Sequence, residues 1–179
     1  MLQLSAHRKA DEIIHGTYWE NGKGCAVGCT IHSGIHSEYE TRFGIPQMLA
    51  HLEDGIFEGM ANGNSKEWPE RFMGAIKPGA DLSRVGWRFL HWLLTDEKVN
   101  PGIKHPLVAE AVAGCADLML ILIREGKVSE SAAWSAAAAA RSAAWAAEEA
   151  ARSAEEAARS AEAAYVLMAD KLVELLEAT

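Results

Sequence analysis

The chain has 179 residues, which is long enough for one compact domain with an extension, and its formal net charge is −8 at pH 7. Proteins that bind phosphate backbones need clustered Lys and Arg, so this charge argues against a nucleic-acid-binding function. No stretch approaches 18 unbroken apolar residues and no signal-like segment opens the chain, so we expect a cytoplasmic protein without a membrane span. The three cysteines, an odd number, favour free thiols or metal ligands over a disulfide framework.

The first segments predict a helix followed by a small hairpin. Residues 3–15 predict a short amphipathic helix whose inward side chains are Leu4, Ile13 and Ile14. Further along, β-prone residues flank Asn21-Gly22, and Asn-Gly between such runs is a strong hairpin signal. The glycines of this region equally permit a glycine-rich loop without strand pairing. We therefore expect a small β-hairpin near residues 17–31, with the loop as the alternative.

Four later segments carry apolar residues at helical spacing, and each is bounded by proline, glycine, asparagine or an N-cap aspartate: residues 46–62, 68–77, 81–96 and 106–126. In the first of them, one face is expected to be buried: Leu49, Leu52, Ile56 and Met60. In the third, Asp81 is the expected N-cap, and in the fourth Gly126 is the expected C-terminal cap. The sequence therefore predicts a mainly α-helical, compact head over residues 1–126.

The remaining residues, 127–179, predict a second domain, one long Ala-rich helix that begins near Ser129. Alanine recurs every seven residues, which keeps a seam of small side chains turned towards a partner helix: Ala140, Ala143, Ala147, Ala150, Ala154 and Ala161. Such a helix would span about 70 Å, far more than a compact domain of this size. We therefore predict a homo-oligomer joined through this helix, like a coiled coil, and the alternative is a single solvated helix.

Four potential zinc ligands lie close together in the sequence: Cys25, Cys29, His32 and His36. Zinc accepts two thiolates and two imidazoles, but structural sites usually separate two ligand pairs by a dozen or more residues. The spacing therefore favours buried thiols beside surface histidines. We expect no cofactor, and zinc at these four residues is the alternative.

Cys25 is also a candidate nucleophile. His32 or His36 could activate its thiol, and the neighbouring glycines would let backbone amides approach an oxyanion. An orienting carboxylate could come from one of four acidic residues: Glu38, Glu40, Glu53 or Asp54. The candidate catalytic residues are therefore Cys25, His32, His36 and Asp54, without an assignment of roles.

A polar face is predicted on the helix that follows Pro46. His51, Asp54 and Glu58 are three and four residues apart, so they share one side of that helix. Together with the two histidines before the helix, they could bind a divalent metal for hydrolysis. A row of this kind is more often a solvated polar face.

Aromatic and arginine side chains are frequent in the head, and five of them are candidate ligand-binding residues: Tyr18, Trp19, Arg71, Trp87 and Arg88. Stacking faces beside guanidinium groups suit a nucleotide-sized ligand. The alternative is that the aromatic rings fill a small helical core.

Short segments spread over nearly the whole chain carry a resemblance: Gly24-Cys25-Ala26-Val27-Gly28-Cys29, Tyr39-Glu40, Gly44-Ile45-Pro46, Leu52-Glu53-Asp54, Ile56-Phe57-Glu58-Gly59, Trp68-Pro69-Glu70-Arg71-Phe72 and Gly79-Ala80-Asp81-Leu82. With these segments and its Ala/Trp/Arg tail, the chain resembles a group of uncharacterised accessory proteins of phages and prophages. The resemblance implies a mobile-element setting and no catalytic residue. Phage accessory proteins often act by binding, for instance by blocking a host defence protein or sequestering its nucleotide signal.

Two functions from different classes follow from these patterns. The first is a non-catalytic binding protein of a phage or prophage, oligomerised through its Ala-rich helix, whose partners are a second copy of itself and a host protein or a small nucleotide. The second is a metal-dependent or Cys/His hydrolase centred on residues 25–58. The strong oligomerisation signal beside weak catalytic signals favours the first.

Overall fold

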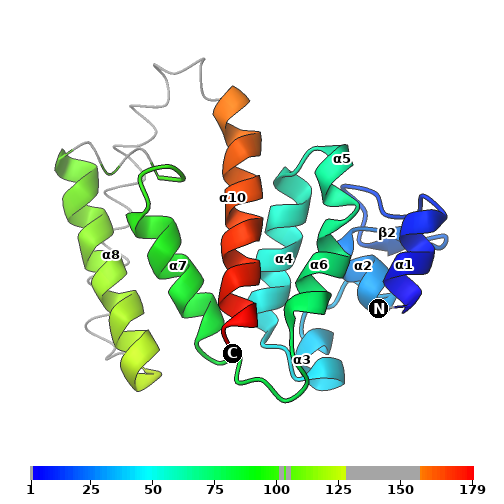
Figure 1. Cartoon of the computed structure of the whole chain (residues 1–179), viewed down its shortest axis with the longest axis horizontal. Coiled ribbons are helices and arrows are strands. Elements are labelled where there is room, and N and C mark those ends of the chain that lie inside the picture. Colours follow the sequence, from blue (N-terminus) through cyan, green and yellow to red (C-terminus); the bar gives the residue numbers. More distant parts are fainter. Residues whose placement is uncertain (1, 101–102, 104–105, 128–157) are drawn as a thin grey trace. The chain divides into compact units, whose positions relative to one another are not determined.

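The computed structural model describes residues 2–100, 103, 106–127 and 158–179, and this part of the chain is mainly α-helical with one small hairpin (Figure 1), as predicted. The chain divides into two compact units, Met1–Gly86 with Tyr165–Thr179, and Trp87–Ala164. Among the helices that the structure describes, none is both long enough and apolar enough to cross a membrane.

The first unit contains most of the described elements: α1 (Leu2–Lys9), β1 (Trp19–Glu20), β2 (Lys23–Gly24), α2 (Ala26–Ile31), α3 (Glu38–Phe43), α4 (Gln47–Gly59), α5 (Asn62–Ser65) and α6 (Trp68–Ala75). Helix α7 (Val85–Thr95) begins at the end of this unit and continues in the second, which also holds α8 (Pro106–Glu125). Helix α10 (Ala158–Glu177) begins in the second unit, and its residues from Tyr165 onwards belong to the first.

The hairpin is confirmed, but it is shorter than predicted. Strands β1 and β2 pair antiparallel around Asn21 and Gly22, whose φ angles of +51° and +83° fit the hairpin turn that Asn-Gly favours. Helix α2 follows at once, where the sequence predicts more strand or a loop. Glycine is needed here for close approach, because a Cβ on Gly28 would lie 1.4 Å from the carbonyl oxygen of Tyr18.

The predicted N-terminal helix is also shorter than expected. Helix α1 ends at Lys9, and Asp11 has a positive φ of +56° that breaks the helical path. Ile13 then forms an isolated parallel bridge with Gly24 of the hairpin. Of the three side chains expected to point inward, Leu4 and Ile13 are buried, Ile14 is only half-buried, and Leu4 alone lies on the helix.

Helix α4 follows Pro46 as predicted, and Leu49, Ile56 and Met60 of its apolar face are buried. Leu52 is only half-buried, whereas the carboxylic acid Glu53 has an exposed fraction of 0%. Trp68, the first residue of α6, donates its indole N–H to the backbone oxygen of Glu53 at 3.0 Å. The face of α4 that packs inward therefore includes one acidic side chain.

Two predicted helix caps have different outcomes. Gly126 has a φ of +74° and donates its N–H to Leu122 O at 3.0 Å, so it caps α8 as predicted. Asp81 does not cap α7, which starts only at Val85. Its carboxylate instead accepts the backbone N–H of Ser83 at 3.0 Å, which stabilises a turn before the helix.

The end of α10 packs into the core of the first unit, beside α4 and α6 (Figure 1). Its buried residues lie on one helical face: Ala169, Leu172 and Leu176. Arg71 of α6 forms an ion pair with Asp170 at 2.7 Å. The two units do not follow the predicted division into residues 1–126 and 127–179, because the last turns of the tail belong to the first unit and the residues from Trp87 onwards belong to the second.

The predicted alanine seam lies mostly outside the described residues. This applies to Ala140, Ala143, Ala147, Ala150 and Ala154, while Ala161 lies in the first turns of α10. Homo-oligomerisation through the tail therefore stays a prediction.

Candidate metal centre

Cys25 is held at the start of α2 by the segment that leads into the hairpin. Its backbone N–H donates to Thr17 O at 2.7 Å and to Tyr18 O at 3.2 Å, and the residue is 1% exposed. Since its backbone is extended and the next residue is helical, Cys25 is the N-cap of α2. The thiol is thus fixed in a buried position facing α4.

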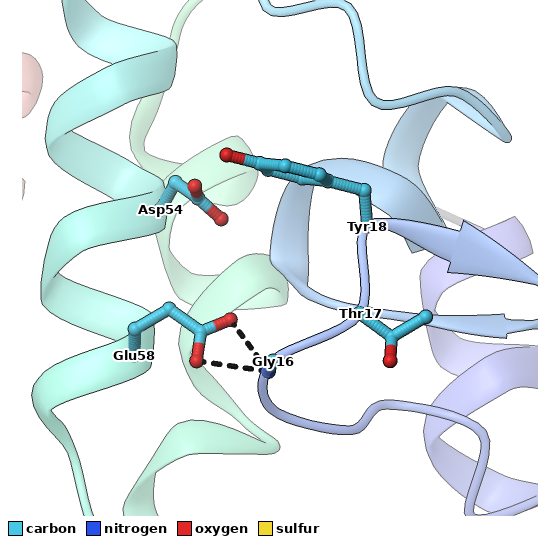
Figure 2. Close-up of a pocket in the computed structure, with 5 residues that line it drawn as sticks. All are labelled: Gly16, Thr17, Tyr18, Asp54 and Glu58. Carbon is cyan, nitrogen blue, oxygen red and sulfur yellow. Dashed lines mark hydrogen bonds between the residues drawn. The ribbon is translucent and has the colours of Figure 1, made fainter.

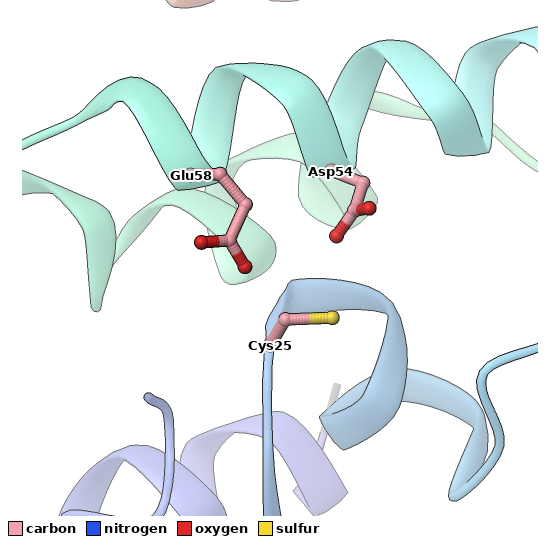
Figure 3. A group of neighbouring side chains, drawn as sticks. All are labelled: Cys25, Asp54 and Glu58. Atoms are coloured by element: carbon pink, nitrogen blue, oxygen red, sulfur yellow. The ribbon is translucent and has the colours of Figure 1, made fainter. Parts of the chain in front are cut away.

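Helix α4 places two carboxylates opposite this thiol. Asp54 and Glu58 are one turn apart and therefore share a face. Single ligand atoms of Cys25, Asp54 and Glu58 all lie within 4.8 Å of one another (Figure 3), and no other group of three or more such ligands is found in the part of the chain that the structure describes. We call these three residues the Cys25 cluster. It runs from a buried thiol to an exposed carboxylate.

A pocket of about 200 Å³ opens beside the cluster (Figure 2). It is lined by Gly16, Thr17, Tyr18, Asp54 and Glu58. The backbone N–H of Gly16 donates to both carboxylate oxygens of Glu58, at 3.1 and 3.0 Å. The ring of Tyr18 is 53% exposed and reaches across towards Asp54. Two residues of the cluster thus form a wall of a space that suits a small chemical group.

The environment keeps the Cys25 thiol protonated when no metal is bound. Burial is the main cause that raises the pKa of Cys25 to about 12, and the negative charge of Asp54 contributes to the rise, while the backbone amides of Gly28 and Val27 partly oppose it. Asp54 Oδ1 is buried and accepts no hydrogen bond. A cation at the cluster would offset the cost of that unpaired oxygen and displace the thiol proton.

One histidine contacts the carboxylate of Asp54, and a second histidine stacks on the first. His36 Nε2 lies 3.2 Å from Asp54 Oδ2, and its ring is buried. His51 stacks on His36 with ring centroids 4.1 Å apart, and Tyr18 meets His36 edge-on at 5.5 Å. Partial burial and the neighbouring His36 lower the pKa of His51, which favours its neutral form. His36 therefore holds Asp54 in place at the wall of the pocket.

The structure does not bring the four predicted zinc ligands together. Cys29 donates its thiol to Gly24 O at 3.3 Å, and His32 pairs with His7 instead of with a cysteine. Only Cys25 of the four belongs to the cluster, where it meets Asp54 and Glu58 of the predicted polar face. The carboxylate beside Cys25 also works against its activation as a free nucleophile, because a negative neighbour disfavours the thiolate.

The five predicted ligand-binding residues take different positions, and of these five only Tyr18 lines the pocket. Trp19 stacks on His32 with ring centroids 4.2 Å apart, and Arg71 is paired with Asp170. Trp87 is half-buried and Arg88 is exposed, both on the part of α7 that lies in the second unit. Gly16 and Thr17 also line the pocket, although the sequence does not single them out. The backbone of Gly16 is left-handed, with a φ of +74°.

No protein-family model, curated protein or solved structure matches this chain in the three comparisons. The resemblance to phage and prophage proteins therefore stays a prediction, and the Cys25 cluster is the feature of the molecule that points to a function.

Proposed function

We propose that the protein is a divalent-metal-dependent hydrolase whose ion is bound by Cys25, Asp54 and Glu58. The observation that carries the proposal is the convergence of one thiol and two carboxylates, from α2 and α4, within 4.8 Å beside a pocket. Three protein ligands with a further position open to water are typical of catalytic zinc sites. A thiolate among the ligands favours zinc over magnesium or calcium, which prefer oxygen.

The surrounding residues have roles that fit hydrolysis. A bound zinc ion would lower the pKa of its water and supply hydroxide at neutral pH. Tyr18, whose side chain lines the pocket (Figure 2), would donate a hydrogen bond to a substrate oxygen. His36 orients Asp54 through its contact at 3.2 Å. The pocket volume of about 200 Å³ suits an acyl or phosphoryl group rather than a whole nucleotide.

This is the second of the two functions that the sequence predicts. The first, a non-catalytic binding protein that blocks a host defence protein or sequesters a nucleotide signal, stays a prediction because its proposed seam lies mostly outside the described residues. Support for hydrolysis comes from three candidate ligands that lie beside a pocket of about 200 Å³.

The proposal is tested by measuring metal content and hydrolysis on the same preparations. Protein purified without chelators is analysed for zinc by mass spectrometry, as wild type and as Cys25→Ser, Asp54→Asn and Glu58→Gln. Cys29→Ser is the matched control, because its buried thiol donates to a backbone carbonyl and lies outside the cluster. We expect zinc in the wild type and the control, and zinc affinity lowered by more than about tenfold in the three variants.

Hydrolysis is measured with p-nitrophenyl acetate and bis(p-nitrophenyl) phosphate as generic acyl and phosphoryl substrates. Turnover should disappear with a chelator, return when zinc is added, and be absent from Asp54→Asn. If all three variants retained zinc as well as the wild type does, the Cys25 cluster would not be the zinc-binding site. Zinc bound at the cluster without turnover of either substrate would leave a metal-binding protein and reject the hydrolase.

A further inference from the structure

The apolar surface of the pocket beside the Cys25 cluster comes from the ring of Tyr18. Of the five described residues that line this pocket, only Tyr18 has a large apolar side chain. The ring is exposed, and in Figure 2 it is seen nearly edge-on, extending towards Asp54 of α4. A group that enters the pocket would therefore lie against this ring.

The loop between α2 and α3 holds the ring in place. A Cβ on Gly34 would lie 3.0 Å from Cβ and 3.1 Å from Cγ of Tyr18, so the absence of a side chain at this position lets the loop backbone pack directly on the tyrosine. His36 meets the ring edge-on, with ring centroids 5.5 Å apart. The backbone oxygen of Tyr18 accepts the N–H of Cys25 at 3.2 Å. The position of the ring is thus set before a ligand binds, which lowers the entropic cost of binding.

The polar part of the pocket is negatively charged. Asp54 and Glu58 line it, and none of its five described lining residues is basic. With zinc bound, the negative charges of the Cys25 thiolate and the two carboxylates exceed the charge of the ion by one. A phosphate ester would bring further negative charge into this site without a cationic side chain to offset it. The carbonyl group of an ester or amide brings none.

We propose that this pocket takes the uncharged acyl group of an ester or amide, whose carbon chain lies against the ring of Tyr18. The inference rests on the proposed hydrolase and selects acyl over phosphoryl substrates for it. Tyr18 then determines specificity through its ring as well as through its hydroxyl, and Gly34 positions the ring. Each methylene that leaves water at the ring should tighten binding by up to about fourfold.

The test compares two small amides that differ only at the end of the acyl chain. N-methylbutyramide ends in a methyl group, and N-methylsuccinamic acid has a carboxylate in its place. Each is titrated by NMR into the full chain with zinc at pH 7. The butyramide should bind more than about tenfold more tightly, because its methyl group leaves water while the carboxylate meets a negative site. In the wild type, its chain protons should show nuclear Overhauser contacts with the ring of Tyr18.

Variants separate the ring of Tyr18 from its hydroxyl. Tyr18→Ala should weaken binding of the butyramide by about tenfold, and Tyr18→Phe should weaken it less because the ring is kept. Gly34→Ala should also weaken it, by less than Tyr18→Ala does, because the added Cβ displaces the ring. Phe43→Ala is the matched control, since this ring is also exposed but lies outside the pocket, and it should bind as the wild type does. Thermal melts show whether each variant is folded.

Equal affinity for the two amides would overturn the inference, and so would a butyramide affinity that Tyr18→Ala leaves unchanged. The absence of contacts with the Tyr18 ring in the wild type would overturn it without any variant.

Hydrolysis of p-nitrophenyl butyrate and mono-p-nitrophenyl succinate is measured in parallel, and kcat/KM should favour the butyrate by more than about tenfold. If the amides bind as expected and neither ester is hydrolysed, the hydrolase proposal fails and the acyl-binding pocket stands. If both esters are hydrolysed equally well and the amides bind equally, the hydrolase stands and the inference about its substrate fails.

Discussion

The hydroxyl of Tyr39 donates a hydrogen bond of 2.6 Å to the carboxylate of Glu53, and both residues have an exposed fraction of 0%. The pKa of Glu53 is raised to about 8, chiefly by burial and also by the charge of neighbouring Asp54, although the hydrogen bond from Tyr39 partly opposes the rise. The pKa of Tyr39 is raised well above its usual value, first by burial and then by Glu53. The core beside the candidate site therefore favours a protonated carboxylic acid.

This pair predicts that metal-free protein loses stability as the pH rises. The folded state binds a proton on Glu53 up to about pH 8, whereas the unfolded state releases it near its ordinary pKa of 4.5. Between these values the folded state binds more protons, so the free energy of unfolding falls as pH rises, by up to about 1.4 kcal/mol per pH unit. Glu53→Gln cannot ionise and should remove most of this slope.

Urea unfolding at several pH values between 5 and 8, with a chelator present, measures the effect. At the alkaline end Glu53→Gln should be more stable than the wild type, and at the acidic end the two should be similar. The exposed Glu40→Gln is the control and should keep the wild-type slope. A wild-type slope that Glu53→Gln leaves unchanged would assign the pH dependence to other groups.

Gly59 of α4 lies against the ring of Tyr165 in α10, where a Cβ would come within 2.1 Å of the ring. We predict that Gly59→Ala destabilises the fold by about 1–3 kcal/mol, because an overpacked core must shift. Gly55 is on the same helix with nothing within 4 Å of an added Cβ, so Gly55→Ala should stabilise the protein by up to about 1 kcal/mol through helix propensity. Chemical denaturation measures the free energy of unfolding of both variants. Equal effects of the two substitutions would contradict the contact between α10 and α4.

The sequence predicts elements whose signals are local. Pro46, Asn21-Gly22 and Gly126 act through the backbone of their own turn, and the structure confirms the helix start, the hairpin and the cap. Helix α2 is missed, because Val27, Thr30 and Ile31 have β propensity, and the buried helix that they form packs against α1, α4, α6 and the hairpin, which no local pattern indicates. Local signals therefore give the order of elements better than their lengths.

The candidate site depends on contacts that no local pattern contains. The sequence groups Asp54 with Glu58 because helical periodicity places them on one face, but Cys25 joins them only through the packing of α2 on α4. His7 and Glu12 are not singled out by the sequence, because the contacts of His7 with Glu12 and with His32 depend on where α1 ends. Predicting such clusters requires knowledge of which elements pack together.

The end of α10 should contribute to stability as core rather than as solvated tail. Leu172 has an exposed fraction of 0%, so Leu172→Ala should cost about 2–5 kcal/mol of unfolding free energy. Leu167 is 36% exposed on the same helix, and Leu167→Ala should cost less than about 1 kcal/mol. Urea unfolding monitored by circular dichroism compares them, and a similar small cost for both would mean that the tail does not complete the N-terminal unit.

Cys25 should react slowly with alkylating agents in the folded, metal-free protein. The residue is 1% exposed, and its pKa of about 12 leaves only about one thiolate in 10⁵ molecules at pH 7. Asp54→Asn removes a charge that raises this pKa, so Cys25 should be labelled faster in that variant. Cys29 is the internal control, because the pKa of its thiol, raised to about 11 chiefly by burial, does not depend on Asp54.

Iodoacetamide labelling followed by peptide mass spectrometry measures both cysteines in one sample. In the wild type, Cys25 and Cys29 should both be labelled more than about 100-fold more slowly than in the denatured chain, because reaction requires an accessible thiolate. In Asp54→Asn the rate at Cys25 should rise while the rate at Cys29 stays the same. If Cys25 of the wild type is labelled as fast as in the denatured chain, its thiol is an accessible nucleophile, and covalent catalysis by Cys25 replaces metal binding as the better explanation of the site.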